Sequence, residues 1–115
     1  MPNAFDYLRG EKYIDLVTYR RSGAAIHTPL WFAEQDGRLI LMTNPASAKV
    51  KRIRNNPNVE VAPCTMRGRR TGPPVPGVAT VAEDQALARR LIRKKYLLAR
   101  LPVWNKNIYL EVGPV

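Results

Sequence analysis

Residues 13–32 read YIDLVTYRRSGAAIHTPLWF, and this stretch predicts the first two strands of an antiparallel sheet. The Tyr13–Tyr19 segment is rich in β-branched and aromatic residues, which favour strands. Arg20–Gly23 predicts a turn, and Ala25–Phe32 follows as the second strand. Because only a short glycine-containing loop separates the two strands, we expect them to pair as a hairpin.

Further strand patterns follow this hairpin along the chain. The Gln35–Gly37 segment predicts a turn that leads into a strand at Arg38–Met42. Residues 63–76 are dense in Gly, Pro and Arg and predict a loop. Three more strands are predicted, at Asn58–Ala62, at Val75–Val81 with a bulge at Gly77, and at Asn107–Val112. Six short strands with two or three helices indicate a mainly β fold, a small antiparallel barrel with the helices packed on it.

Two helices are predicted between the strands. The first begins with Asn44 as N-cap and Pro45 at its first position, and it ends at Asn55-Asn56-Pro57. The second begins after Glu83 and Asp84, whose charges suit the helix macrodipole. The apolar stripes are Ala46, Val50 and Ile53 for the first helix, and Leu87, Leu91 and Leu98 with Ala88 and Ile92 for the second.

Length and composition exclude several classes of protein. The chain of 115 residues and 13.0 kDa, with 45% hydrophobic residues, predicts one folded domain over residues 1–115. It carries no apolar run of about 20 residues and no signal-peptide pattern, which predicts a cytoplasmic protein without a membrane span. Cys64 is the one cysteine and His27 the one histidine. They exclude an internal disulfide and make a four-ligand zinc site a poor expectation.

The positive charge of the chain indicates an anionic partner. Nineteen Lys and Arg against nine Asp and Glu give a net charge of +10, and Glu60 is the one acid between Asp36 and Glu83. Such a field attracts anions such as a phosphorylated small molecule, nucleic acid or an acidic surface. The basic residues gather at 49–54, at 67–70 and at 89–100.

The junction between the third strand and the first helix is the strongest candidate for a phosphate site. Thr43 and Ser47 offer hydroxyl groups there, and Lys49 and Lys51 offer charge. The first N–H groups of a helix have no partner within the helix and favour an anion. The alternative is a capped helix with a solvated basic face.

The sequence resembles the pyridoxamine 5'-phosphate oxidase-like split barrels, and within them the small flavin/deazaflavin oxidoreductases of the coenzyme F-420-dependent branch. The resemblance covers nearly the whole chain. It is carried by YIDLVTYRRSG (13–23), HTPLWF (27–32), SAKVKRIRNNP (47–57), VAPC (61–64) and GRRTG (68–72).

The resemblance implies an FMN-binding split barrel that forms a homodimer, with cofactor clefts between the subunits. It implies that the cofactor ring lies against the backbone of Thr28, Pro29 and Leu30, and that the phosphate lies at the Ser47–Lys51 region. Cys64 is a further candidate for the pocket lining, with a buried inert thiol as the alternative. The predicted cofactor-binding set is Thr28, Pro29, Leu30, Thr43, Ser47, Lys49, Lys51, Arg54 and Cys64.

Two departures from the family pattern bear on the reaction. Pyridoxamine phosphate oxidases carry an Arg-Lys pair where this chain has Ala48-Lys49, and they are longer at the C-terminus. Oxidation of pyridoxamine phosphate is therefore not expected. The oligoglutamate tail of F-420 needs a longer basic groove than FMN, and residues 49–54 with Arg67–Arg70 favour F-420, with FMN as the alternative.

The expected function is an oxidoreductase that transfers a hydride between F-420 or FMN and a small unsaturated substrate. The cofactor carries the chemistry, so no catalytic side chain is required. His27 is interpreted as a structural histidine or one that supports a cofactor-binding residue, with a catalytic acid as the alternative. A non-enzymatic carrier or sensor of the same cofactor is the first alternative. A basic nucleic-acid-binding domain is the second, and the scarcity of aromatic residues among the basic clusters disfavours it.

Overall fold

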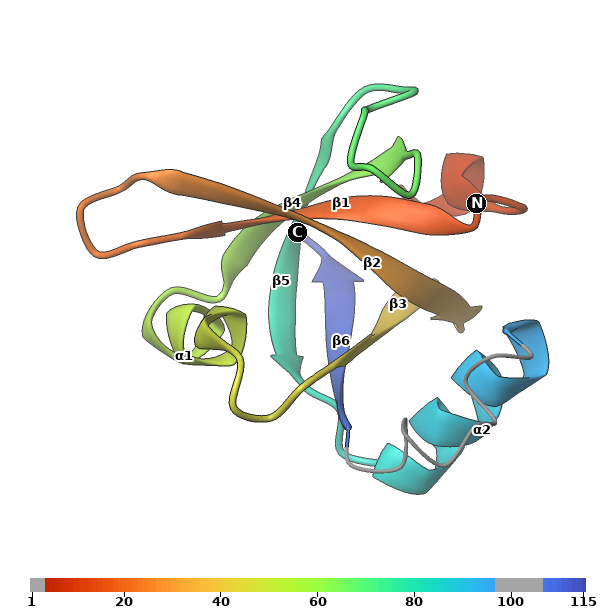
Figure 1. The fold of residues 1–115 in the computed structure, drawn as a ribbon. Coiled ribbons are helices and arrows are strands. Elements are labelled where there is room, and N and C mark those ends of the chain that lie inside the picture. The colour runs from red at the N-terminus through yellow and green to blue at the C-terminus, as the bar shows by residue number, and fades with distance from the viewer. Residues whose placement is uncertain (1–3, 97–106) are drawn as a thin grey trace.

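Six antiparallel strands close into one barrel in the order β1-β2-β3-β6-β5-β4. The computed structural model describes residues 4–96 and 107–115. The short 3-10 helix η1 (Asp6–Leu8) precedes the barrel, and two α-helices lie outside it (Figure 1). The strands are β1 (Tyr13–Tyr19), β2 (Ala25–Gln35), β3 (Arg38–Thr43), β4 (Asn58–Cys64), β5 (Val75–Val81) and β6 (Ile108–Pro114), and the helices are α1 (Ala48–Asn55) and α2 (Gln85–Lys95). The predicted mainly β fold is confirmed. None of the helices in the described residues has the length and apolar character that crossing a bilayer requires.

The predicted β1–β2 hairpin forms and reaches beyond the rest of the barrel (Figure 1). Its register runs from Tyr13 opposite Trp31 to Tyr19 opposite Ala25. The strand β3 pairs with β2 only over residues 32–35, so residues 25–31 pair with β1 alone. Pro29 is tolerated in this half of the strand because a strand edge does not need every N–H group. The consequence is an open backbone edge beside the barrel.

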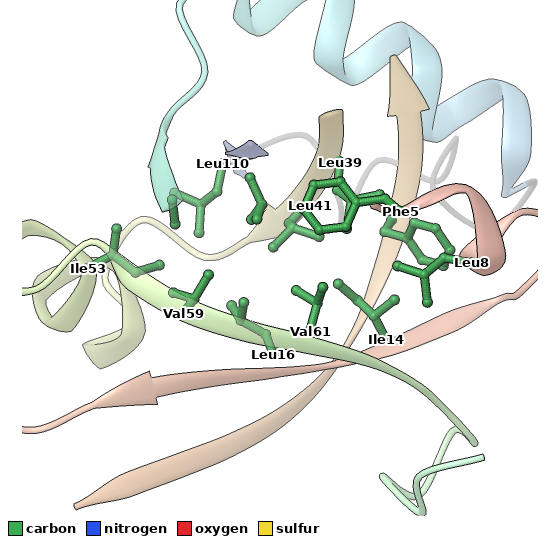
Figure 2. Close-up of a cluster of buried hydrophobic side chains, with 13 residues drawn as sticks. Phe5, Leu8, Ile14, Leu16, Leu39, Leu41, Ile53, Val59, Val61 and Leu110 are labelled. Carbon is green, nitrogen blue, oxygen red and sulfur yellow. The ribbon is translucent and has the colours of Figure 1, made fainter. Parts of the chain in front are cut away.

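The barrel interior holds the main hydrophobic core (Figure 2). Alternate residues of β1, such as Ile14 and Leu16, point into it, where they meet Phe5 and Leu8 from the η1 region. Residues directly opposite one another in paired strands share a face. We call the face that carries Ile14, Leu16 and Thr18 the inner face of the hairpin, and the face that carries Asp15 and Val17 the outer face.

Helix α1 starts later than predicted. The side chain of Asn44 accepts a hydrogen bond from the Ala46 N–H at 2.8 Å, which closes a turn around Pro45. Ser47 is the N-cap, and its Oγ accepts the Lys49 N–H at 3.3 Å. Ala46 is exposed and lies before the helix, so the buried stripe contains only Val50 and Ile53. Because the Asn44 side chain accepts a hydrogen bond within this turn, it does not cap the helix, and Ser47 is the N-cap instead.

Helix α2 begins after Asp84, as predicted, and packs on β2, β3 and β6. The Asp84 carboxylate accepts the Leu87 N–H at 2.9 Å. The fully buried residues are Ala88 and Ile92, whereas Leu87 and Leu91 are half-buried at the margin. Leu98 lies outside the described residues.

The predicted bulge at Gly77 is absent. The strands β4 and β5 pair in an unbroken register with Val59 opposite Gly77, and on its other side Gly77 lies opposite Pro114 of β6. A Cβ at this position would lie 2.6 Å from Cγ1 of Val112. Glycine is therefore required by a close approach across the barrel, and not by a change in register.

Candidate cofactor site

Thr43, Ser47 and Lys49 meet where β3 passes into α1. The Lys49 Nζ donates to Thr43 Oγ1 at 3.0 Å and to Ser47 Oγ at 2.8 Å. Thr43 is buried at the end of its strand, and Ser47 is fixed by its role as helix cap. The predicted junction thus places two hydroxyl groups and one ammonium group together. We call these three residues the Lys49 cluster.

Arg52 adds a second cation on the same side of α1. Its Nε donates to Thr18 Oγ1 at 2.7 Å, which links the helix to the β1–β2 hairpin. Burial lowers the pKa of Lys49, and the charge of Arg52 lowers it further. In the part of the chain that the structure describes, neither Lys49 nor Arg52 forms an ion pair with a carboxylate. The two neighbouring cations are therefore complementary to an anion.

Lys51 and Arg54 do not join this cluster. Both are exposed, and Arg54 lines a separate cavity of about 280 Å³ with Ala79 and Val81 of β5. Residues three apart lie on one side of a helix, so Lys51 shares the side of Arg54. The sequence indicates one group of basic residues at 49–54. In the structure the turn of the helix separates Lys49 and Arg52 from Lys51 and Arg54, on two sides of α1.

The predicted ring-binding residues lie on the open half of β2. Thr28 pairs with Leu16 and so belongs to the inner face, together with Ile26 and its partner Thr18. Arg52 reaches this same face through Thr18, about 7 Å along the strand from Thr28, since a strand rises about 3.3 Å per residue. The Lys49 cluster and the edge strand are thus connected through one side chain.

Two further predicted residues line a hollow at the end of that edge. Pro29 and Leu30 contribute to a space of about 180 Å³ that also involves Tyr13, Trp31 and Met42. Trp31 stacks on Tyr96 with ring centroids 4.8 Å apart, which fixes its indole against the start of the hollow. Apolar and aromatic surface therefore lies next to the free backbone edge.

Cys64 lies on the outer face, away from the Lys49 cluster. It pairs with Tyr13 and is buried beneath the loop that follows β4. Burial, aided by the charge of Asp15, raises the pKa of its thiol to about 11. A protonated buried thiol is inert, which agrees with the alternative weighed from the sequence.

Arg67–Arg70 also lies on the outer side of the hairpin. Arg70 Nε donates to the buried Asp15 carboxylate at 2.8 Å, and Gly68 lies over Pro29. Arg52 approaches the hairpin from the inner face, so the two basic segments do not form one continuous groove within a protomer. This separation removes the within-chain observation that favoured F-420 over FMN.

Sequence reasoning did not assign Thr18 or Asp15 to the site, and it placed Arg52 only in a basic groove for the tail of F-420. Thr18 continues the inward alternation of Ile14 and Leu16, and a polar residue at that place was the available signal. The contact of Arg52 with Thr18 spans 34 positions in the sequence, so no local pattern predicts it. Asp15 occupies a strand that is buried on both faces, and its β-branched and aromatic composition does not indicate which partner a buried carboxylate will find.

Comparison with known proteins identifies the family. The model for pyridoxamine 5'-phosphate oxidase matches residues 2–107. The fold is similar to General Stress Protein 26 from Bacillus anthracis str. Sterne, with 26% identity, a TM-score of 0.67, and coverage of 93% of this chain and 82% of that chain.

Two further solved structures share the fold. A FAD-binding protein from Mesorhizobium loti has 19% identity and a TM-score of 0.70, covering 94% of this chain and 84% of that one. A heme storage protein from Vibrio cholerae has 13% identity and a TM-score of 0.69, covering 96% and 86% respectively. No curated protein sequence matches the chain. The family match spans nearly the whole sequence, and the chain belongs to the pyridoxamine 5'-phosphate oxidase family.

Proposed function

We propose that this protein is a flavin- or deazaflavin-dependent oxidoreductase that acts on a small unsaturated organic substrate. The observation that carries the proposal is the pair of cations Lys49 and Arg52, which have no carboxylate partner in the described chain and stand beside two hydroxyl groups. A phosphate would supply the missing charge and accept the hydrogen bonds. The site residues present therefore fit a phosphate-bearing cofactor.

In this proposal each part of the site has one task. Lys49 and Arg52 bind the phosphate, while Thr43 and Ser47 orient the ammonium group. The backbone of Thr28–Leu30 offers its free edge to the ring, and Trp31 closes one side. The cofactor, when bound, supplies the hydride chemistry. FMN needs one phosphate contact and fits the Lys49 cluster alone, whereas F-420 needs further cations, for which Lys51 and Arg54 are candidates on the other flank of α1.

A homodimer completes this proposal. Residues 25–31 pair with β1 alone among the described residues, and a second copy would cover this open edge. The fold is also used by a FAD-binding protein and by a heme storage protein. For that reason hemin belongs in the binding test, where a tight complex would favour a carrier.

A salt series with FMN and F-420 tests the cofactor assignment. Purified protein is titrated with each, and with hemin as comparison, by fluorescence quenching. Surface ion pairs are screened as the Debye length falls from about 10 Å at 0.1 M to about 3 Å at 1 M salt. If F-420 is the cofactor, its affinity falls steeply with salt and further with a shortened tail, while FMN shows a shallow slope. Tighter binding of FMN at physiological salt identifies an FMN protein, and binding of neither contradicts the proposal.

A further inference from the structure

A buried carboxylate holds the one histidine of the chain on the outer face of the hairpin. His27 Nδ1 lies 2.7 Å from Asp15 Oδ2, and Arg70 Nε donates to the same oxygen at 2.8 Å. The Asp15 side chain is 2% exposed, whereas the His27 side chain is 55% exposed. The acid is thus buried, the guanidinium that pairs with it is half-buried, and the imidazole faces solvent.

This arrangement determines which ring nitrogen is available. An ionised carboxylate accepts hydrogen bonds and donates none, so Nδ1 of His27 carries the hydrogen in the contact with Asp15. In the neutral ring the other nitrogen, Nε2, then carries a lone pair and no hydrogen. Arg70 also approaches Glu60, at 3.9 Å, so the guanidinium that contacts Asp15 is shared between two carboxylates.

The Asp15 carboxylate is only partly satisfied by hydrogen bonds within the described residues. Its Oδ1 is buried and accepts no hydrogen bond within the described residues, while Oδ2 accepts two. An unsatisfied buried oxygen destabilises a fold. Such a group in a native protein calls for an explanation, and orientation of a functional imidazole is one.

We propose that His27 is the proton donor and acceptor of this protein, with Asp15 as its positioning residue. The inference rests on the proposed function. His27 immediately precedes Thr28 on the open half of β2, so its ring borders the edge against which the cofactor ring is proposed to lie. In reduction of an activated alkene, a hydride leaves the reduced cofactor for one carbon, and Nε2 of the imidazolium gives its proton to the enolate oxygen or neighbouring carbon. His27 is left neutral and regains a proton from water.

The tautomer is tested first, without any cofactor. Because the chain has a single histidine, a nitrogen-15 spectrum contains one pair of imidazole signals. We expect the neutral imidazole of the native protein, observed at alkaline pH, to carry its hydrogen on Nδ1 with Nε2 unprotonated, and Asp15→Asn to change that ratio. An Nε2–H tautomer in the native protein overturns the proposal whichever cofactor binds, and this result does not depend on whether the variant folds.

The proton transfer is tested with two electron acceptors. The protein loaded with reduced FMN is mixed with cyclohexenone, which needs a hydride and a proton, or with ferricyanide, which takes single electrons and no proton. Reduced F-420, a hydride donor, is tested with cyclohexenone alone. We expect His27→Gln to slow the first reaction by about 100-fold or more, the usual range for a lost general acid, and to leave the second unchanged. Tyr7→Phe is the matched control, because it removes the hydrogen bond from Tyr7 to the Pro73 carbonyl in the loop that carries Arg70. This variant should alter neither the cyclohexenone reaction nor the ferricyanide reaction.

The outcomes separate the two proposals. Equal cyclohexenone reduction by His27→Gln and wild type overturns the role of His27 while the proposed function stands. Equal slowing of both acceptors by His27→Gln also overturns it, because the defect then lies in cofactor binding. If the wild type binds neither FMN nor F-420, the proposed function fails and the catalytic role of His27 fails with it. The measured tautomer of His27 does not depend on that result.

Discussion

At the scale of single residues, the candidate site depends on how Lys49 is held. Its ammonium group donates to two hydroxyl oxygens that carry no full charge, and its neighbour is another cation. Burial and the charge of Arg52 both lower its pKa below the ordinary 10.5. A Lys whose charged form is disfavoured in the folded protein gains most from an anionic ligand.

We therefore expect phosphate binding and proton uptake to be coupled at Lys49. A bound phosphate stabilises the ammonium form and raises the pKa of Lys49, so the complex holds a proton that the free protein begins to lose below pH 10.5. The affinity for FMN should decrease as the pH rises through the Lys49 pKa of the free protein. Fluorescence titrations across the alkaline range measure this decrease.

Lys49→Arg is the control for that titration. A guanidinium stays charged throughout the range, so its complex should lose only the affinity that follows from titration of the cofactor itself. The same steep decrease in both proteins would mean that Lys49 does not contact the phosphate.

At the scale of elements, the strands and the β1–β2 pairing were predictable, and the other strand partners were not. Composition and alternation located Tyr13–Tyr19 and Val75–Val81 with the same ends that the structure has. The start of α1 was missed because Asn44 and Ser47 are both good caps, and the choice between them depends on a local turn. The division of Lys49 from Lys51 follows from helix geometry once the buried stripe is known.

Gly77 illustrates a constraint that only the closed barrel reveals. We expect Gly77→Ala to lower the free energy of unfolding by about 1–3 kcal/mol, because the new Cβ would overlap Val112 and approach the Gly113 carbonyl at 3.1 Å. Urea denaturation measures the change. Gly113→Ala is the control on the adjacent strand, since its Cβ meets only the flexible end of Arg38 at 3.2 Å. Equal losses in the two variants would mean that the close approach at Gly77 does not matter.

At the scale of the whole molecule, one chain leaves its hairpin incomplete. Residues 25–31 have no strand on their second side among the described residues, and half-buried Ile26 and Leu30 lie along them. The loop arginines and the α1 cations lie on opposite faces of this hairpin. No sequence pattern predicts such a separation, because it depends on which face of β1 each distant segment approaches.

A second copy is expected to cover this edge. Stable homodimers commonly bury more than about 2,000 Å² in total, and sedimentation equilibrium should give a species of twice 13.0 kDa at micromolar concentration. A single species of 13.0 kDa under those conditions would contradict the dimer and leave the cofactor to a one-chain site.

The most direct measurement of the central claim compares Lys49→Ala with Lys51→Ala for FMN affinity. The two variants lose the same charge from the same helix, two positions apart, but only Lys49 joins Thr43 and Ser47. A charge-assisted hydrogen bond contributes about 1.5–3 kcal/mol, so Lys49→Ala should weaken binding about tenfold or more, and Lys51→Ala much less. Equal weakening by both would show that a diffuse basic field attracts the cofactor, and that the Lys49 cluster is not its phosphate site.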